Sequence, residues 1–460
     1  MIGASGYFRV VWHRLADDPP AMRSIPLLAP FLSLFAAAAA SAEPCGLDAT
    51  FRDGGVAHDP APQALGKFDA VARDPRGGYL AAGEGDTGES PYFTVVFVAR
   101  YLRDGSLDAG YGNGGFARWQ ETPEDGAPDN ASLSKVDDVA AAPDGSALVL
   151  GYQVLTTDAV DIQLWRFTSA GAIDTGFGDA GVAHLQCGAT PFDASDYALP
   201  RLLLDESGRA VVTTQRGTRV VVMRVRSDGA PDPAFGSESP GCSTFDRQVR
   251  QPAGVVRRGA GYELAGGRDG QVWTLRIDEA GAPDATYGTA GLVTTTAPAV
   301  HFVSAIALQG DRLVLGAESG DDLAAVRLTT AGALDASFAG GGVRAVPMPD
   351  EPSDQEFAQD LAVAEDGRIA VAGLYDTFDE PGELLVALMD ADGQDPAAGC
   401  DAGNRVAVSA QKGADARGFG VAFDGDRVVL VGGASERGYQ RDETAIAVLA
   451  PGVLFRNGFD

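Results

Sequence analysis

The sequence predicts an all-β protein built from about seven copies of one short repeat, and three observations carry this prediction. A phrase with the pattern G-x-[L/I/P]-D-x-x-[F/Y]-G recurs along the chain, for example at residues 105–112 and 171–178. Apolar alternation around a D-G turn, as at Asp144-Gly145, precedes copies of the phrase, and this combination is a strong hairpin signal. Helical periodicity is almost absent after residue 42.

The spacing of the phrase predicts a β-propeller. The clear copies carry their aspartate at Asp48, Asp108, Asp174, Asp232, Asp284 and Asp335, at intervals of 51 to 66 residues. Each repeat reads as four strands, a to d, with short a–b and c–d turns and longer b–c and d–a connections, as in a propeller blade. Strands a to c occur seven times, whereas the first phrase, at residues 46–56, has no strands before it. We therefore expect seven blades, with six or eight as alternatives, and a ring closed by the N-terminal strand in the last blade.

The N-terminal 42 residues predict an over-extended start followed by an export signal. Met22-Arg23 begins a short basic segment, residues 25–40 are apolar, and Ala40-Ser41-Ala42 fits a cleavage site after Ala42. We expect the true start at Met22, one propeller domain at 43–450 and a C-terminal tail at 451–460. The run at 25–40 is too short for a membrane span and no second apolar segment reaches spanning length, so the expected protein is periplasmic or extracellular and is not inserted in a membrane.

Charge and cysteine content indicate which partners and which disulfides to expect. A net charge of −29 disfavours nucleic acid as a partner and favours an unknown basic protein or a cationic ligand. We expect a monomer. The four cysteines suit disulfides in an oxidising compartment. Their places in adjacent repeats predict the pairs Cys187–Cys242 and Cys45–Cys400, the second of which would hold the ring closure.

Repeated charged and aromatic residues are assigned to structure. An arginine stands eight residues before the phrase aspartate, which predicts the ion pairs Arg100–Asp108, Arg166–Asp174, Arg224–Asp232, Arg276–Asp284 and Arg327–Asp335. The phrase aromatics, such as Phe177 and Phe235, are expected to pack between blades rather than to bind a ligand.

These motifs resemble a known repeat family. The run D-G-x-[I/L/V]-x-V-x-G, an apolar strand with an arginine, and D-G-S-L-D-x-x-[F/Y]-G-x-x-G, best seen at residues 102–115, are similar to the delta-60 repeat. The resemblance covers nearly the whole chain after residue 42. It implies a bacterial β-propeller of unknown function with an exported location, and it implies no catalytic residues.

Function is expected in the loops that do not repeat. The acidic candidates lie in the variable b–c and d–a segments: Glu84, Asp86, Glu89, Glu121, Glu124, Asp125, Asp350, Glu351, Asp354, Asp376, Asp379 and Glu380. Such loops on a fixed scaffold suit binding, so a non-catalytic binding or scaffold protein is the leading hypothesis.

Two other classes stay open. One is a lyase or hydrolase with carboxylates near the central channel, which the small apolar residues of strands a disfavour. The other is a structural or adhesive surface module. No cofactor is expected, although Asp390, Asp392 and Asp395 resemble a shortened calcium loop that lacks the distal glutamate, with a plain hairpin turn as the alternative.

Overall fold

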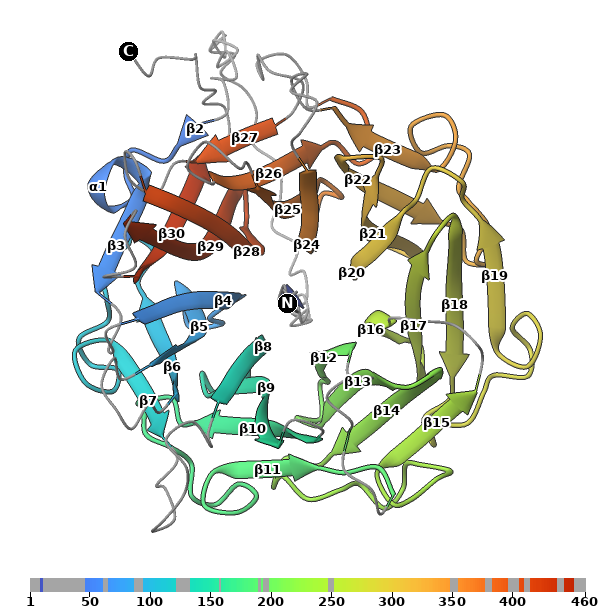
Figure 1. Cartoon of the computed structure of the whole chain (residues 1–460), viewed down its shortest axis with the longest axis horizontal. Helices are drawn as coiled ribbons and strands as arrows, with labels where there is room; N and C mark the ends of the chain where they lie inside the picture. The colour runs from blue at the N-terminus through green and yellow to red at the C-terminus, as the bar shows by residue number, and fades with distance from the viewer. Residues whose placement is uncertain are drawn as a thin grey trace, which may run out of the picture.

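The structure is a computed structural model, and it describes most of the chain after residue 45. The described residues are 9–10, 46–60, 65–86, 94–120, 133–156, 159–188, 192, 198–246, 252–347, 355–376, 383–395, 405–408, 414–436 and 442–450. They form an all-β fold with a β-propeller arrangement of four-stranded antiparallel blades around a central axis (Figure 1). Among these residues, no helix is long and apolar enough to span a membrane.

Three of the sheets contain one blade each. The first is β8 (Leu133–Ala141), β9 (Ala147–Thr156), β10 (Ala159–Phe167) and β11 (Val182–Leu185), and β1 (Arg9–Val10) adds to β8 as a parallel strand. The second is β12 (Ala198–Leu204), β13 (Ala210–Arg216), β14 (Arg219–Val225) and β15 (Cys242–Asp246). The third is β24 (Gln355–Val363), β25 (Ile369–Asp376), β26 (Glu383–Met389) and β27 (Arg405–Val408).

Two larger sheets complete the ring. One has eight strands: β16 (Pro252–Arg258), β17 (Gly261–Arg268), β18 (Gln271–Ile277), β19 (Leu292–Thr296), β20 (Phe302–Gln309), β21 (Arg312–Ser319), β22 (Asp322–Leu328) and β23 (Val343–Val346). The other contains β4 (Leu65–Arg73), β5 (Tyr79–Asp86), β6 (Thr94–Tyr101), β7 (Phe116–Gln120), β28 (Ala414–Asp424), β29 (Arg427–Glu436) and β30 (Asp442–Ala450), with β2 (Gly46–Leu47) and β3 (Val56–Pro60) on β30. The hydrogen bonds thus define five sheets rather than seven separate ones, because the single pairs Arg268–Phe302 and Asp442–Leu65 each join neighbouring strand sets.

The strand of the first phrase, β3, lies in the same blade as the C-terminal strands. β3 pairs antiparallel with β30, from Val56 opposite Ala447 to Pro60 opposite Glu443. The short helix α1 (Arg52–Gly55) precedes β3, and the Arg52 guanidinium is 3.0 Å from the carboxylate of Asp59. Residues far apart in the chain therefore share one sheet, as the first phrase predicts.

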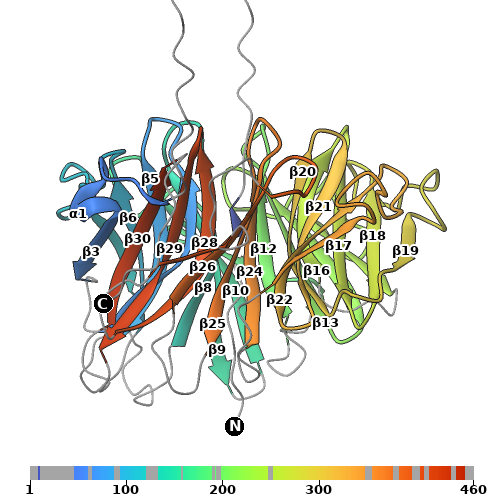
Figure 2. The ribbon, with the colours of Figure 1, turned by 90° about the horizontal axis from the view of Figure 1, so that it is seen from above.

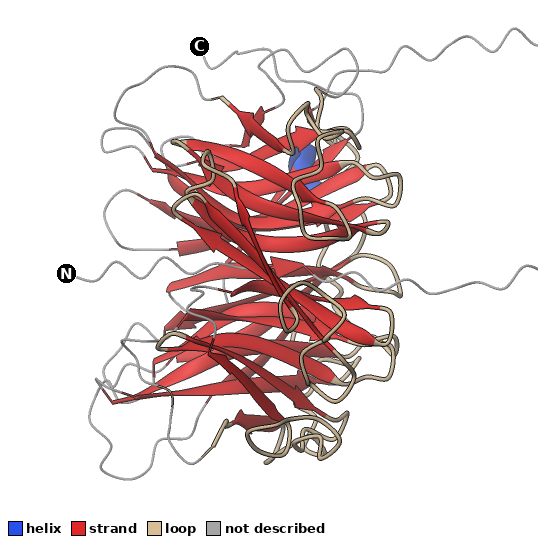
Figure 3. Cartoon of the chain, turned by 90° about the vertical axis from the view of Figure 1, so that its right-hand side faces the viewer, coloured by secondary structure: helices blue, strands red, loops and turns tan. Residues whose placement is uncertain are grey.

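The a–b and c–d turns lie together on one face of the disk, which we call the turn face. Figures 2 and 3 show the strands running between the two faces, with the described turns gathered at one side. Their sequences explain their shape: the Asp144 carboxylate accepts the N–H of Ser146 at 2.9 Å, and Gly145 has φ +80°. A side-chain acceptor followed by a glycine with positive φ closes such a turn without strain.

The hydrophobic core lies between adjacent blades. The aromatic residues at the same position of the repeated phrase are buried there, as predicted. They include Phe177, Phe235 and Phe338, which are at most 2 % exposed. The next blade covers each ring with a phrase glycine: a Cβ on Gly281, at φ +81°, would lie 2.8 Å from the Phe235 ring. The glycine is therefore required by a close approach as well as by its backbone conformation.

Candidate functional site: the axial channel and its cavity

Several of the innermost strands carry a polar residue at one shared level of the axis. These inner strands are β4, β8, β12, β16, β20, β24 and β28, which ring the centre in Figure 1. Each of them has a register shift at an equivalent place, and the residue there is polar in β4, β8, β20 and β24 (Asp69, Asp137, Ser304 and Gln359) but apolar in β16 and β28 (Ala253 and Phe419). A bulge redirects a side chain away from the regular pattern. In β4, β8, β20 and β24, the small apolar residues that predominate on the inner strands give way to a polar residue at this position.

Contacts between different inner strands connect the polar residues near this level. The Arg201 guanidinium on β12 donates to the carbonyl of Ser304 on β20 at 3.2 Å, although the β16–β19 strands lie between them in the ring. Asp360 on β24 accepts the N–H groups of Leu361 at 2.8 Å and of Val421 at 2.9 Å. Burial raises the pKa of Asp360 well above its usual range; these N–H groups lower it, and the Asp138 carboxylate adds to the rise.

A pair of buried carboxyl groups lies beside this level on β4 and β5. Glu84 is 3.2 Å from Lys67 and 3.1 Å from Lys135, and it accepts the N–H of Val136 at 2.8 Å. Asp69 contacts the Lys67 ammonium, while its Oδ2 has no donor among the described residues.

The two carboxyls differ in ionisation. Burial raises the pKa of Asp69 well above its usual range, and repulsion from the Glu84 carboxylate adds to the rise. Burial also opposes ionisation of Glu84, but the ammonium groups of Lys135 and Lys67 outweigh it and lower the pKa of Glu84. One neutral and one ionised carboxyl side by side are suited to proton transfer.

A cavity of about 920 Å³ opens near the turn face; we call it the axial cavity. Its apolar wall comes from the ends of inner strands, with Leu203, Val256, Leu308 and Val363 among the lining residues. Its charged lining residues are Arg73, Asp205, Glu206, Arg209, Arg257, Glu365, Asp366, Arg368 and Asp426. The volume falls in the range of sites for small molecules.

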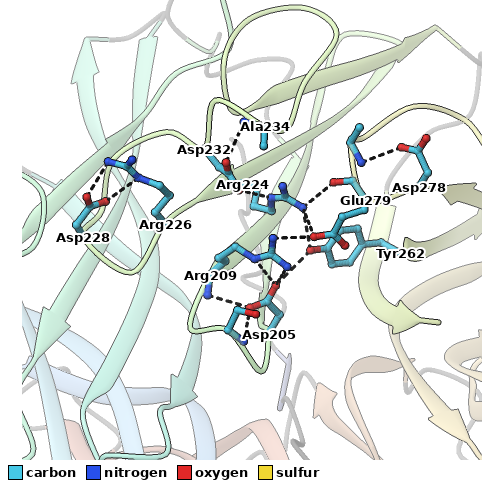
Figure 4. A network of polar contacts seen from close by, with 12 residues as sticks. Asp205, Arg209, Arg224, Arg226, Asp228, Asp232, Ala234, Tyr262, Asp278 and Glu279 are labelled. Atoms are coloured by element: carbon cyan, nitrogen blue, oxygen red, sulfur yellow. Dashed lines mark hydrogen bonds and ion pairs between the residues drawn. The ribbon is translucent and has the colours of Figure 1, made fainter. Parts of the chain in front are cut away.

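Ion pairs fix the arginines of this lining. Glu279 accepts from Arg209 and Arg257 at 2.7 Å each and lies 3.1 Å from Arg224, as Figure 4 shows for Arg209 and Arg224. Asp205 accepts from Arg209 at 2.7 Å, and the Tyr262 hydroxyl donates to Asp205 at 3.3 Å. Burial opposes ionisation of Glu279, but its hydrogen bonds from Arg257 and Arg209 lower the pKa of its carboxyl. The network therefore holds these charges in place in the ionised state.

Four of the five predicted arginine–aspartate pairs are present. The distances are 3.3 Å for Arg100–Asp108, 3.3 Å for Arg166–Asp174, 2.8 Å for Arg224–Asp232 and 2.7 Å for Arg327–Asp335. The fifth prediction is wrong: Arg276 pairs with Glu263 at 3.1 Å and not with Asp284, although the Asp284 N–H still donates to the Arg276 carbonyl at 2.9 Å. The reason is that Glu263 lies directly opposite Arg276 on β17, where the four blades with the predicted pair have Leu or Val.

Sequence reasoning missed a second role of these arginines. Their guanidinium groups also donate to a carbonyl in the c–d turn of the next blade: Arg166 to Ser227, Arg224 to Glu279, Arg276 to Thr330 and Arg327 to Ala391, at 2.5 to 2.8 Å. Several also stack on the phrase aromatic, as Arg224 does on Phe235 at 4.7 Å. The repeated arginine therefore joins two blades, a relation that a constant offset within one repeat does not indicate.

The cysteine prediction is confirmed where it is described. Cys187 and Cys242 form a disulfide with a Cα–Cα distance of 5.5 Å between adjacent blades. Cys45 and Cys400 lie outside the described residues.

Most of the acidic loop candidates also lie outside the described residues: Glu89, Glu121, Glu124, Asp125, Asp350, Glu351, Asp354, Asp379 and Glu380. Asp86 and Asp376 are the last residues of β5 and β25. Glu84 does not belong to an exposed acidic face, because it is a strand residue only 5 % exposed, held by two lysines.

The shortened calcium loop forms a turn whose carboxylates have other partners. Asp390 accepts the N–H groups of Asp392 and Gln394, and Asp395 pairs with Arg344. Asp392 lies 3.8 Å from Arg327. Within the described part of the chain, no group of three or more His, Cys, Asp or Glu is placed to hold a metal ion.

Comparison with known proteins gives distant likenesses. No family model and no curated protein matches the chain. A Dyadobacter fermentans protein of unknown function has a TM-score of 0.42 at 12 % identity, over 86 % of this chain and 99 % of that one. The polysaccharide lyase Uly1 has 0.42 at 11 % identity, over 86 % and 91 %. A Penicillium chrysogenum alpha-L-arabinanase has 0.37 at 11 % identity, over 85 % and 96 %. Likenesses this low carry no argument about activity.

Proposed function

We propose that the protein is an exported seven-bladed β-propeller of the delta-60 repeat family and that it binds a ligand in the axial cavity. The observation that carries the binding proposal is the cavity itself, about 920 Å³ with an apolar wall and fixed charges. The partner is a cationic ligand or a basic protein, and the protein acts as a monomer. Binding through the acidic loops of the opposite face stays a prediction.

The blade count has its support in the inner strands. Seven inner strands carry the same register shift, and each begins a set of antiparallel strands. The two larger sheets each divide into two such sets at a single residue pair. In the set that begins with β28, the outer strand is β3 from the N-terminal part of the chain. Export has its support in the Cys187–Cys242 disulfide.

The binding proposal is tested by filling the cavity. Crystals soaked with a library of small polar and amphiphilic fragments are expected to show bound fragments in the axial cavity. Ser207→Trp, at an exposed turn position of its lining, is expected to remove that density. Thr330→Trp, at an exposed turn outside the lining, is the matched control and should leave it unchanged. Fragments that bind elsewhere, or equally in both variants, would contradict the proposal.

The second candidate is an enzyme that uses the Asp69–Glu84 pair as acid and base. It is favoured by the opposite ionisation of two adjacent buried carboxyls beside the axis. Its test is a screen for polysaccharide hydrolysis by new reducing ends and for lyase products by ultraviolet absorbance. Asp69→Asn and Glu84→Gln should each abolish any activity found, whereas Asp161→Asn, on the outer part of its blade, should retain it. Equal activity in all three variants would exclude this pair.

A further inference from the structure

The axial cavity has two chemically different zones along the axis. Leu203, Val256 and Leu308 lie at the ends of inner strands, before the turns begin. The acidic residues Glu206 and Glu365 follow in the a–b turns, where both are exposed. An apolar wall below a charged rim accommodates a ligand with an apolar stem and a polar head.

The positive charges of the lining are already neutralised. Arg73 is 3.0 Å from Asp424, and Arg368 is 2.7 Å from both Asp366 and Asp426. Arg209 and Arg257 are held by Glu279, as described above. An anionic ligand at this rim would therefore have to compete with the carboxylates that already pair with these arginines.

The negative charges are not all neutralised. Glu206 and Glu365 have no ion-pair partner among the described residues of the chain, and both are exposed at the rim. They belong to the β12–β13 and β24–β25 turns, whose strands lie on opposite sides of the axis in Figure 1. Both carboxylates therefore add negative charge to the rim of the axial cavity. The net charge of the whole chain, −29, adds a general attraction for cations.

We propose that the axial cavity binds an amphiphilic organic cation, with its alkyl stem against the inner-strand ends and its ammonium group at the rim that carries Glu206 and Glu365. This inference rests on the proposed function, since it names the ligand class of the same cavity. Such a ligand could be a short alkylamine or a lysine side chain of a partner protein. A free amine and a partner's lysine share this chemistry.

The test uses three probes with one stem and different heads: hexylammonium, hexan-1-ol and hexanoate. Binding to the full chain is measured by isothermal titration at low salt and by NMR shifts of the Leu203 and Val256 methyl groups. Hexylammonium is expected to bind most tightly, hexanol more weakly and hexanoate least. Nα-acetyl-lysine methylamide shows whether a lysine side chain also enters.

Matched variants assign the head group. Glu206→Gln and Glu365→Gln are each expected to weaken hexylammonium binding about three- to fivefold and to leave hexanol unchanged, because one carboxylate near water contributes about this much. Glu238→Gln, an exposed acid outside the lining, should have no effect.

Each other outcome decides between the two proposals. Equal binding of all three probes, or tighter binding of hexanoate, would refute the proposal that the ligand is a cation. It would not affect the proposal that the cavity binds a ligand. The proposal of a cationic ligand is also refuted if hexylammonium does not shift the NMR signals of the Leu203 and Val256 methyl groups while soaked fragments fill the cavity. If neither the probes nor the fragments enter, both proposals fail.

Discussion

Arginines at one position of the repeat should differ strongly in their contribution to stability. Arg224 has a side chain only 1 % exposed and pairs with Asp232, which is 9 % exposed. Arg166 is 24 % exposed, and its partner Asp174 is 30 % exposed. Replacing each arginine by methionine keeps most of the apolar stem and removes the charge, so the pair of variants isolates the effect of burial.

The magnitudes follow from what each substitution leaves behind. Arg224→Met leaves the buried Asp232 carboxylate with the N–H of Ala234, and it removes the donor to the Glu279 carbonyl. Removing one partner of a buried pair costs about 3 to 5 kcal/mol. Arg166→Met breaks a partly exposed pair at 3.3 Å, which is worth about 1 kcal/mol or less, plus a hydrogen bond to the exposed Ser227 carbonyl.

Guanidinium chloride denaturation of both variants measures the difference in the free energy of unfolding, provided that the m-values agree with that of the unsubstituted protein. Arg224→Met is expected to lose at least about 2 kcal/mol more than Arg166→Met. Adding Asp232→Asn to Arg224→Met should recover part of the loss, because it removes the uncompensated charge. Equal losses in the two single variants, or no recovery in the double variant, would refute the argument from burial.

Three further predictions concern other features of the ring. Breaking the disulfide with Cys187→Ser and Cys242→Ser should lower the free energy of unfolding by up to about 4 kcal/mol, because it frees a loop with a sequence separation of 55 residues; a loss under about 1 kcal/mol would contradict this. Burial raises the pKa of the Glu318 carboxyl from 4.5 to about 7, although the N–H of Ala358 and the charge of Arg268 lower it. The folded state therefore holds the carboxyl proton more tightly than the unfolded state does. Stability contributed by the protonated form is therefore lost as pH rises from about 4.5 to about 7, and thermal melts across this range should show a smaller decline for Glu318→Gln than for the unsubstituted protein. Gly332→Ala should destabilise more than Gly340→Ala in the same melts, since both glycines have φ near +80° but only the first Cβ would meet a neighbouring blade, at Tyr287; equal losses would assign the whole cost to φ.

The repeat could be predicted in detail because its signals are local. The D-G turns, the alternating apolar residues and the phrase glycines each act within a few residues, and the structure forms turns and strands at those places. The disulfide partners Cys187 and Cys242 could also be chosen, since a constant period assigns both cysteines to the same part of adjacent repeats. Local chemistry repeated at a fixed interval carries this much information.

The incorrectly predicted pair Arg276–Asp284 shows what the repeat pattern does not determine. Arg276 stands at the same offset from Asp284 as the other arginines from their aspartates, yet it pairs with Glu263. The offset describes one turn of one blade, whereas the choice of partner depends on the residue opposite Arg276 in the neighbouring strand. The inter-blade hydrogen bonds of the repeated arginines were missed for the same reason.

The sequence by itself determined the all-β class, the four-stranded repeat and the blade-to-blade disulfide, because these depend on periodicity and local turn chemistry. Only the tertiary structure decided where the charged groups meet. Lys67, Asp69 and Glu84 look like ordinary strand and loop residues in the sequence, and Glu206 and Glu365 like ordinary turn residues. Closing the strands around an axis brings the first group into a buried carboxyl pair beside the channel and places the second on opposite sides of one cavity. Such convergence depends on the curvature of the ring, which no single repeat contains.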